Sequence, residues 1–315
     1  MHESIHIRFT SHTLRVAIAF SICCLAFAAR AQDYVDVVKV NFNNTSRNSF
    51  ENSNITTRIR ETDVETTVGF ALNNSTRFIT GFIYENINCR LTTADTETTF
   101  GSAALKLGIN KIHSEKWSGT YLLLPKIASD FKGFVKKDLQ FGAVALLKYT
   151  KNEHLAYKVG VYYNTELFGP WVVPLAGLYY RSADRKIEAN LTLPLLADIN
   201  YSVRHKVAVG FNFSGQVRTY HLSAIANGND GYVARSINEL FAYLKLSLTE
   251  NIILQLRGGR SVARHYRVYD DHEKVSLGLP LVYIGDGRKQ LNNDLKDGWV
   301  YQAILLYRLF PGHQN

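Results

Sequence analysis

The last strand-like run of the chain, residues 299–310, is the feature that most limits the possible folds. Every second residue forms one wholly apolar face, made of Trp299, Tyr301, Ala303, Leu305, Tyr307 and Leu309. The opposite face includes Gln302 and Arg308. A strand that crosses a bilayer needs one apolar face with aromatic residues towards its ends. The run therefore predicts a membrane-crossing strand, although an edge strand of a soluble sheet could carry the same pattern.

The N-terminus has the layout of an export signal. Arg8 and Arg15 precede an apolar run at 16–27, and Ala29-Arg30-Ala31 supplies the small residues that a signal peptidase reads. The run is too short to cross a bilayer as a stable helix. We therefore predict a signal peptide over residues 1–31 and a barrel domain over residues 32–315. A buried N-terminal helix is the alternative.

Composition narrows the class of protein further. Cleavage would remove three arginines and one glutamate, so the formal charge would fall from +9 to +7. Cys89 would then be the only cysteine, which excludes an intramolecular disulfide and a small disulfide-stabilised domain. No later stretch approaches the ~20 consecutive apolar residues of a transmembrane helix. An exported chain of this kind suits a β-barrel, in which lumen residues dilute the apolar ones.

Alternation of apolar with small or polar residues recurs along the chain. It is clearest at 102–110, 139–149, 155–164, 206–214 and 240–248. A period of two indicates strands, and the second face is small, polar and lightly basic, as in a barrel interior. We therefore predict an all-β fold, a transmembrane antiparallel up-and-down β-barrel of about 14 strands. Twelve strands are the alternative, because the hairpin at 186–203 is short.

The connections between these strands are of two kinds. Short polar turns are expected at 73–75, 113–116, 152–154, 182–185, 204–206 and 249–251. Longer connections are expected near 43–54, 92–98, 131–137, 222–233 and 270–297. Outer-membrane barrels have short periplasmic turns and longer external loops, so the alternation of lengths assigns an external end. The last strand should close the barrel by pairing with residues 34–42.

Prolines provide an independent test of this topology. Proline cannot donate to a sheet ladder, so it should lie at strand ends or in loops. Pro125, Pro174, Pro194 and Pro280 each follow an apolar-led triplet and are expected at or near the external rim. Pro194 should mark a tight hairpin between two short strands.

The chain also resembles a known family. The signal, the runs at 33–40 and 79–86, and the triplets before proline are the residues that carry the resemblance. They resemble an uncharacterised outer-membrane β-barrel family of the Bacteroidota, catalogued as a domain of unknown function. The resemblance implies the fold and a location in the outer membrane, and it implies no activity. Residues 311–315, which follow the terminal aromatic residue, depart from the usual pattern.

The densest cluster of titratable residues lies at 264–273. An aspartate holding a histidine as general base would give a rim-located hydrolase, with His265, Asp270, Asp271 or His272 as candidates. No G-x-S-x-G motif accompanies the cluster. The simpler interpretation is a solvated loop whose cations meet lipopolysaccharide phosphates. We therefore predict that the chain is not an enzyme.

A second cluster, Gly285-Asp286-Gly287 with Asp294 and Asp297, could offer oxygen ligands to calcium. Its spacing matches no EF-hand loop, and turn chemistry explains Asp-Gly pairs equally well. We therefore expect neither a metal site nor a cofactor.

Basic residues lie on the predicted lumen face of several strands. The candidates for solute selectivity are Lys106, Lys148, Lys158, Lys245 and Arg257, to which Lys206 and Arg308 can be added. In an open pore they would favour anionic solutes through the local field. The alternative is that they pair with lumen acids such as Glu85, pair with plug residues, or extend to the periplasmic rim.

The leading functional prediction is a porin-like pore or transporter for small or hydrophobic solutes. A barrel of about twelve to fourteen strands is too wide for side chains to fill, unlike one of eight. The alternatives are a structural or adhesive barrel without transport, and the rim hydrolase. A soluble secreted β-sandwich would replace all three if the chain is not a membrane protein.

The expected partners follow from the predicted location. They are outer-membrane lipid, lipopolysaccharide and the barrel-assembly machinery. Nucleic acid is not expected, because the chain has no phosphate-binding loop and its basic charge is spread over many strands. The oligomeric state cannot be predicted.

Overall fold

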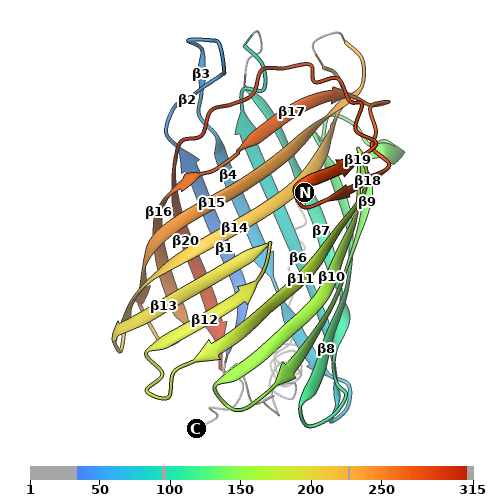
Figure 1. Ribbon diagram of the computed structural model, residues 1–315. Helices are drawn as coiled ribbons and strands as arrows, with labels where there is room; N and C mark the ends of the chain where they lie inside the picture. Colours follow the sequence, from blue (N-terminus) through green and yellow to red (C-terminus); the bar gives the residue numbers. More distant parts are fainter. Residues whose placement is uncertain (1–33, 94–96, 226–227, 311–315) are drawn as a thin grey trace, which may run out of the picture.

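The computed structural model describes residues 34–93, 97–225 and 228–310, which form a closed antiparallel β-barrel (Figure 1). The predicted signal peptide and the tail at 311–315 lie outside the described residues. Among the described residues, no helix is long and apolar enough to cross a membrane. The only helix in this part of the chain is the short 3₁₀ helix η1 (Lys136–Asp138).

Fourteen barrel strands follow one another in up-and-down order, as predicted. Two of them are interrupted: β4 (Arg60–Thr66) continues as β5 (Val68–Ala71), and β16 (Ile252–Ser261) continues as β17 (His265–Asp270). The others are β1 (Val35–Thr45), β6 (Thr76–Cys89), β7 (Thr98–Ile112), β8 (Trp117–Ser129), β9 (Leu139–Thr150), β10 (Leu155–Glu166), β11 (Gly169–Arg181), β12 (Ile187–Thr192), β13 (Leu196–Arg204), β14 (Val207–Leu222), β15 (Gly231–Ser247) and β20 (Trp299–Leu309).

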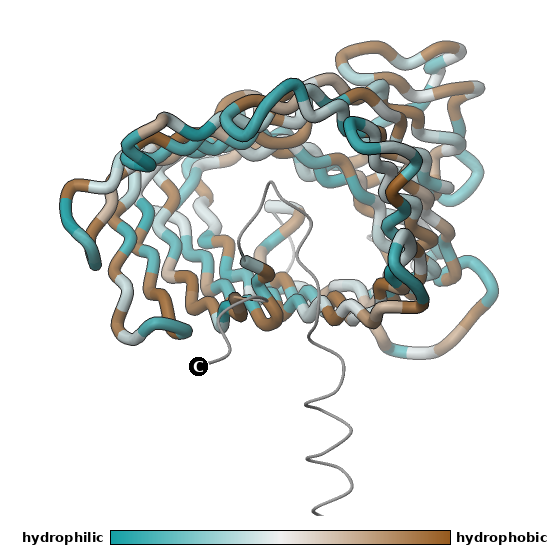
Figure 2. The backbone as a smooth tube through the Cα atoms, turned by 90° about the horizontal axis from the view of Figure 1, so that it is seen from below, coloured by the Kyte–Doolittle hydropathy of each residue, from teal (hydrophilic) through white to brown (hydrophobic). Residues whose placement is uncertain are grey.

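The last strand closes the barrel, as the sequence predicted. β20 pairs with β1 from Val35↔Leu309 to Thr45↔Val300, and its other edge pairs with β16. One face of β20 points outward, where Trp299, Tyr301, Leu305 and Tyr307 are exposed. Figure 2, which views the barrel from below, shows hydrophilic and hydrophobic residues alternating along the strands around a ring.

The two ends of the barrel differ in the length of their connections. One end, here called the short-turn end, carries the six predicted short turns. The other, the long-loop end, carries η1 and two small hairpins, β2 (Asn48–Ser49) with β3 (Thr56–Thr57) and β18 (Leu277–Leu279) with β19 (Val282–Ile284). β10 and β11 are the exception, because only two residues join them at this end.

The hairpin of β12 and β13 has Pro194 in its turn as predicted, but it stops well short of the long-loop end, so Pro194 does not lie at the rim where it was expected. β13 and its turn accompany β14 only as far as Gly215, whose N–H donates to the Leu195 carbonyl, although β14 continues to Leu222. On the other side, β12 follows β11 no further than the bridge between Leu193 and Ala176. The edge of β11 at 169–175 and the edge of β14 at 216–222 therefore have no β12 or β13 partner. We call this interval in the wall the seam.

Two prolines explain how β11 tolerates a bare edge. Ala176 directs both its N–H and its carbonyl to Leu193 at this edge, so positions 174, 172 and 170 face the same way. Pro174 and Pro170 have no N–H to leave unpaired. The expectation that Pro174 lies at a strand end was wrong, because the relevant feature is the unpaired edge. The hairpin of β18 and β19 touches this edge through the parallel bridge Gly278↔Trp171.

Pro125 also lies inside a strand, β8, contrary to the prediction. The ladder between β7 and β8 is interrupted between the pairs Ala104↔Lys126 and Leu107↔Leu123. The register is the same on both sides of the interruption, which lies at Pro125 because proline has no N–H to donate to the ladder.

Beyond the seam, β14 turns towards β8, and the sheet of β14, β15 and β17 becomes an interior layer. His221 forms a parallel bridge with Ser129, and the Asp130 N–H donates to the His221 carbonyl at 2.9 Å. One face of this layer packs on β6 and β7 in the first core cluster, which includes Ile87, Phe100, Tyr220, Val233 and Tyr266. The other face packs on β11 in the second core cluster, which includes Phe168, Trp171, Val173, Tyr232 and Tyr269. Packed side chains thus fill the long-loop half of the barrel.

Candidate functional site in the barrel lumen

Acidic and amide side chains line one wall of the lumen below the first core cluster. Glu61, Asp63 and Glu65 alternate along β4 and therefore point to the same face. Opposite them on β1 stand Asn43, Asn41 and Lys39, in the pairs Asn43↔Glu61, Asn41↔Asp63 and Lys39↔Glu65. Glu85 on β6 adds a further carboxylate, opposite Asp63.

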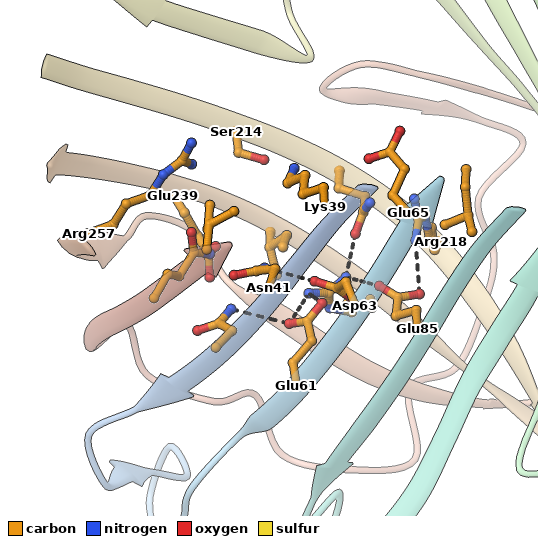
Figure 3. Close-up of a pocket in the computed structure, with 17 residues that line it drawn as sticks. Lys39, Asn41, Glu61, Asp63, Glu65, Glu85, Ser214, Arg218, Glu239 and Arg257 are labelled. Atoms are coloured by element: carbon orange, nitrogen blue, oxygen red, sulfur yellow. Dashed lines mark hydrogen bonds and ion pairs between the residues drawn. The ribbon is translucent and has the colours of Figure 1, made fainter. Parts of the chain in front are cut away.

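Arginines face this acidic wall from the other side of the lumen (Figure 3). Arg218 comes from β14, Arg235 from β15 and Arg257 from β16. Between the two walls lies a cavity of about 180 Å³, which we call the lumen cavity. Its lining also includes Ser214, Gln216 and Glu239.

Arg235 joins the two walls. Its guanidinium is buried, with 1 % of the residue exposed, and Nη2 contacts both carboxylate oxygens of Glu61 at 2.7 Å. Nη1 contacts Glu85 Oε1 at 3.1 Å, and Nε donates to the Tyr266 hydroxyl at 2.9 Å. A buried charge is tolerated only with this degree of pairing, because desolvation of an unpaired ion is costly. Arg235 therefore holds β15 against β4 and β6.

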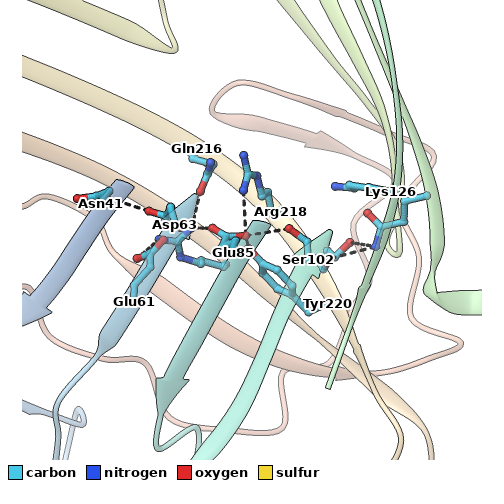
Figure 4. Close-up of polar contacts among 12 residues, drawn as sticks. Asn41, Glu61, Asp63, Glu85, Ser102, Lys126, Gln216, Arg218 and Tyr220 are labelled. Carbon is cyan, nitrogen blue, oxygen red and sulfur yellow. Dashed lines mark hydrogen bonds and ion pairs between the residues drawn. The ribbon is translucent and has the colours of Figure 1, made fainter. Parts of the chain in front are cut away.

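Glu85 is the centre of the network on the β6 side (Figure 4). Its Oε2 accepts hydrogen bonds from Arg218 Nη1 at 2.9 Å, the Tyr220 hydroxyl at 2.5 Å and Ser102 Oγ at 3.2 Å. Oxygens of Glu61, Asp63 and Glu85 lie within 4.8 Å of one another, a spacing that a metal ion could bridge. Arg235 and Arg218 already supply the positive charge at Glu61 and Glu85, so this arrangement does not favour a metal.

Asp63 differs from its two neighbours. In the described part of the chain it forms no ion pair, and its Oδ2 accepts only the Asn41 Nδ2–H, at 2.8 Å. The amide oxygens of Asn41 and Asn43, which are both buried, also have no hydrogen-bond partner there. The acidic wall therefore keeps acceptors that a solute could use. With arginines opposite, the two walls create a transverse field that would orient a dipolar solute.

The structure divides the predicted lumen cations among several places, although Lys148 and Lys158 are cross-strand partners on β9 and β10. Only Arg257 lines the lumen cavity, where Nη1 donates to Asn212 Oδ1 at 2.8 Å. Lys106 pairs with Glu65 at 2.5 Å, and Lys158 donates to Asn190 Oδ1 at 2.5 Å. Lys148 and Lys245 are half-buried on their strands. Their effect on anion selectivity stays a prediction.

The acidic wall was missed at the sequence level, although the signal was present. The segment Arg60-Glu-Thr-Asp-Val-Glu-Thr66 places an acid at every second position. It lacks the apolar alternate face of the clearest predicted strands, so the pattern did not single out its carboxylates as lumen residues. Arg235 and Arg218 could not be assigned, because their partners are 174 to 133 residues away in the chain.

The cluster at 264–273 contains one Asp–His contact, between Asp271 Oδ1 and His272 Nε2 at 3.3 Å. His272 is exposed, Asp271 also contacts Lys137, and His265 Nδ1 lies 3.4 Å from Asp294, so the candidates are not gathered into one enclosed site. A buried Asp–His pair does exist elsewhere in the described residues. His221 Nδ1 lies 2.7 Å from Asp138 Oδ1, and the two residues are 83 positions apart.

The acids of the second loop cluster each have a different partner. Asp294 forms a two-point contact with Arg267 at 2.9 and 2.8 Å, and Asp286 contacts Arg288 Nε at 2.9 Å. Asp297 accepts the backbone N–H groups of Ala263 and Arg264. The three acids therefore have separate partners and do not form one set of oxygen ligands around a common position.

The fold and the charged interior define this chain as a closed antiparallel β-barrel protein with a polar lumen. Residues 84–275 match the family model described as "Domain of unknown function (DUF6268)", and the chain belongs to this family. The expected membership of an uncharacterised family is therefore confirmed, whereas the expected origin in the Bacteroidota stays a prediction. No curated protein matches the chain.

Several solved structures have a similar overall arrangement. One is the COG4313 outer membrane channel from Pseudomonas putida F1, with a TM-score of 0.46, 8% identity and coverage of 90% of this chain and 97% of that chain. Another is the Pseudomonas putida toluene transporter TodX, with a TM-score of 0.40, 9% identity and coverage of 86% and 88%. The NanC porin has a TM-score of 0.37, 11% identity and coverage of 87% and 100%.

Proposed function

We propose that this protein is an integral outer-membrane channel that passes small polar solutes through the lumen cavity. The carrying observation is the cavity itself, which lies inside a closed barrel between an acidic wall and an arginine wall. Charged walls favour polar over hydrophobic solutes. A polar solute can replace the hydrogen bonds that the wall residues lose when water is displaced, and a hydrophobic solute cannot.

The outer surface of the barrel supports a membrane location. Large apolar side chains are exposed on many strands; examples are Leu105, Leu107, Val159, Val161, Phe211, Leu240 and Leu305. Such an apolar belt would be unfavourable in water and is what a lipid-facing barrel requires. Export through a signal peptide cleaved after Ala31 is part of the same proposal.

The proposed channel is closed in this conformation. Arg235 and the first core cluster lie between the lumen cavity and the long-loop end, so a solute would need these groups to move. A structural barrel without transport is the second candidate, and this filled half is the observation that favours it. The predicted rim hydrolase has less support, since the histidine of its one Asp–His contact, Asp271 with His272, is exposed and Asp271 is also paired with Lys137.

Conductance distinguishes the two candidates. The refolded protein is inserted into planar bilayers, and Asp63→Asn is compared with Glu97→Gln, which changes a partly exposed acid in a loop. We expect gated conductance, and a reversal potential that moves towards anion preference in Asp63→Asn only. A folded protein that neither conducts nor transports solutes into liposomes would favour the structural barrel.

A further inference from the structure

A second cavity opens at the long-loop end, outside the lumen cavity. It has a volume of about 500 Å³ and lies between η1 with the start of β9, the turn from β10 to β11, the facing ends of β14 and β15, and residues 271–274. We call it the rim pocket. Its volume falls within the roughly 300–1,000 Å³ of small-molecule sites.

Two buried side chains in the lining of the rim pocket have polar atoms without partners. His221 is 3 % exposed, and its Nε2 has no hydrogen bond within the described residues. Gln140 is 6 % exposed, and its Oε1 is likewise unpaired there. Leaving a buried polar atom without a partner is unfavourable, so each atom indicates a ligand group that would satisfy it.

The neighbours of both residues hold these atoms in place. His221 Nδ1 is engaged by Asp138 Oδ1 at 2.7 Å, while Nε2 is 3.7 Å from Asp230 Oδ2, beyond hydrogen-bond distance. Gln140 Nε2 donates to the Thr219 carbonyl at 3.0 Å, which directs Oε1 elsewhere. The ring and the amide are therefore preorganised, so ligand binding would lose little side-chain entropy in ordering them.

The charges in the lining balance and are already paired. Lys137 contacts Asp271 and Asp230, and Lys274 Nζ donates to the Leu167 carbonyl at 2.6 Å. Glu166 Oε2 accepts the backbone N–H of Thr219 at 2.7 Å. Two lysines thus face two carboxylates, those of Glu166 and Asp271, so the rim pocket offers no excess charge to an ionic ligand.

We infer that the rim pocket binds an uncharged, hydroxyl-bearing molecule of the size of a mono- or disaccharide. A hydroxyl group donates to Gln140 Oε1, and another can donate to or accept from His221 Nε2, because a hydroxyl has both capacities. Leu139, Leu167 and Tyr232 provide the apolar surface on which the C–H face of a sugar ring packs.

The rim pocket lies at the long-loop end, which the connection lengths assign to the outside of the cell, and capture of solute there for transport rests on the proposed function. Binding itself does not. It is measured on the purified, folded full-length barrel in detergent, so failure of transport and failure of binding are separate results.

Isothermal titration with D-glucose and maltose tests the inference. We expect saturable binding of at least one sugar, weakened about tenfold or more by His221→Asn and by Gln140→Met. Asn retains a donor near Nδ1 for Asp138 and removes Nε2, while Met retains the length of Gln and removes its oxygen. His205→Asn, in an exposed turn at the short-turn end, should bind like the unchanged protein.

Three results would overturn the inference. The first is no saturable binding of either sugar by the folded protein. The second is tighter binding of gluconate or of toluene, which would mean an anionic or an apolar ligand. The third is equal sugar affinity in the folded variants and the unchanged protein. Folding is checked by heat-dependent gel mobility, and if His221→Asn does not fold, Gln140→Met decides.

Discussion

The two halves of this barrel use the same strands in different ways. Towards the short-turn end, β10 alternates in the expected manner, with Tyr157, Val159 and Val161 exposed on the outside. Towards the long-loop end, successive residues of β14 from Thr219 to Leu222 are all buried, as are Gly231 to Val233 of β15. Apolar residues alternate with polar ones where the two faces of a sheet have different surroundings. The alternation disappears where protein covers both faces.

The difference has an energetic consequence. In the short-turn half, a strand is stabilised mainly by backbone hydrogen bonds to its neighbours and by the lipid or detergent around the barrel. In the long-loop half, packing in two core clusters and buried ion pairs add stability that is independent of lipid. Substitutions matched between the halves should therefore have unequal effects.

The largest effect is expected from Arg235→Met. Loss of the guanidinium leaves Glu61 and Glu85 buried with one cation fewer, and breaking a buried pair typically costs about 3–5 kcal/mol. The free energy of unfolding is measured by denaturant titration in detergent. Arg60→Met, which removes an exposed pair with Glu97, should cost no more than about 1 kcal/mol. Similar losses in both variants would contradict the comparison.

A core isoleucine should show the same contrast without charge. Ile87→Ala opens a cavity in the first core cluster and should cost about 2–5 kcal/mol. Ile199→Ala removes the same atoms from the outer face of β13 and should cost much less, because Ile199 is already 46% exposed. The same titration decides, and equal costs would mean that the long-loop half is not a packed core.

Thr219→Val tests the side chains that replace a strand partner on β14. The hydroxyl accepts the Leu167 N–H at 2.7 Å and donates to Glu166 Oε2 at 2.6 Å. Its loss leaves buried partners unsatisfied, at a cost of about 1–3 kcal/mol. Thr80→Val, at a position of β6 that does not line the lumen cavity, should change stability by no more than about 0.5 kcal/mol. No difference between the two variants would mean that the seam edge needs no such support.

Gly278→Val should loosen the hairpin of β18 and β19 with little effect on global stability. A Cβ at Gly278 would lie 2.5 Å from Trp171 Cε3, so the hairpin must shift away from β11. Hydrogen exchange at 277–284 should accelerate. Gly287→Val is the matched control, since a Cβ there meets nothing within 4 Å. Unchanged exchange in Gly278→Val would show that the hairpin is held elsewhere.

The smallest effect concerns pH. The hydrogen bond from Lys137 holds the pKa of Asp271 below its ordinary value of 3.8. A lowered carboxyl pKa adds stability above the ordinary value, and this stability is lost as pH falls through the lowered pKa. Proteolysis near 271–274 by an acid-active protease should therefore increase at the lowest pH. Lys137→Met should abolish that pH dependence, and its persistence would rule out the contact as the cause.

Local patterns were sufficient to predict the parts of the fold that depend on one strand and its neighbour. The pairing of β20 with β1 and the six short turns follow from alternation and turn residues. The proline rule failed at Pro174 because it concerns the ladder edge, and the sequence does not show which edge lacks a partner. The choice between twelve and fourteen strands depended on Pro194, which did mark a hairpin.

The candidate sites were harder to predict for a different reason. Lys106 was assigned to the lumen, but its pairing with Glu65 depends on the register of β4 and β7 on the two sides of β6. The contact of Arg235 with Glu61 crosses the barrel, and so does that of His221 with Asp138. Such contacts depend on the inward turn of β14 and β15, for which the alternation pattern has no signal.

The bare edge of β11 has a consequence for the mechanics of the molecule. An ordinary exposed edge is a template that recruits another strand, but this one lacks amide donors at Pro170 and Pro174 and cannot be extended by a regular ladder. Two barrels therefore should not join there. Because the hairpin of β12 and β13 does not extend into the seam, few backbone hydrogen bonds there resist separation of β11 from β14. If the lumen ever widens, we expect the wall to part along this line first.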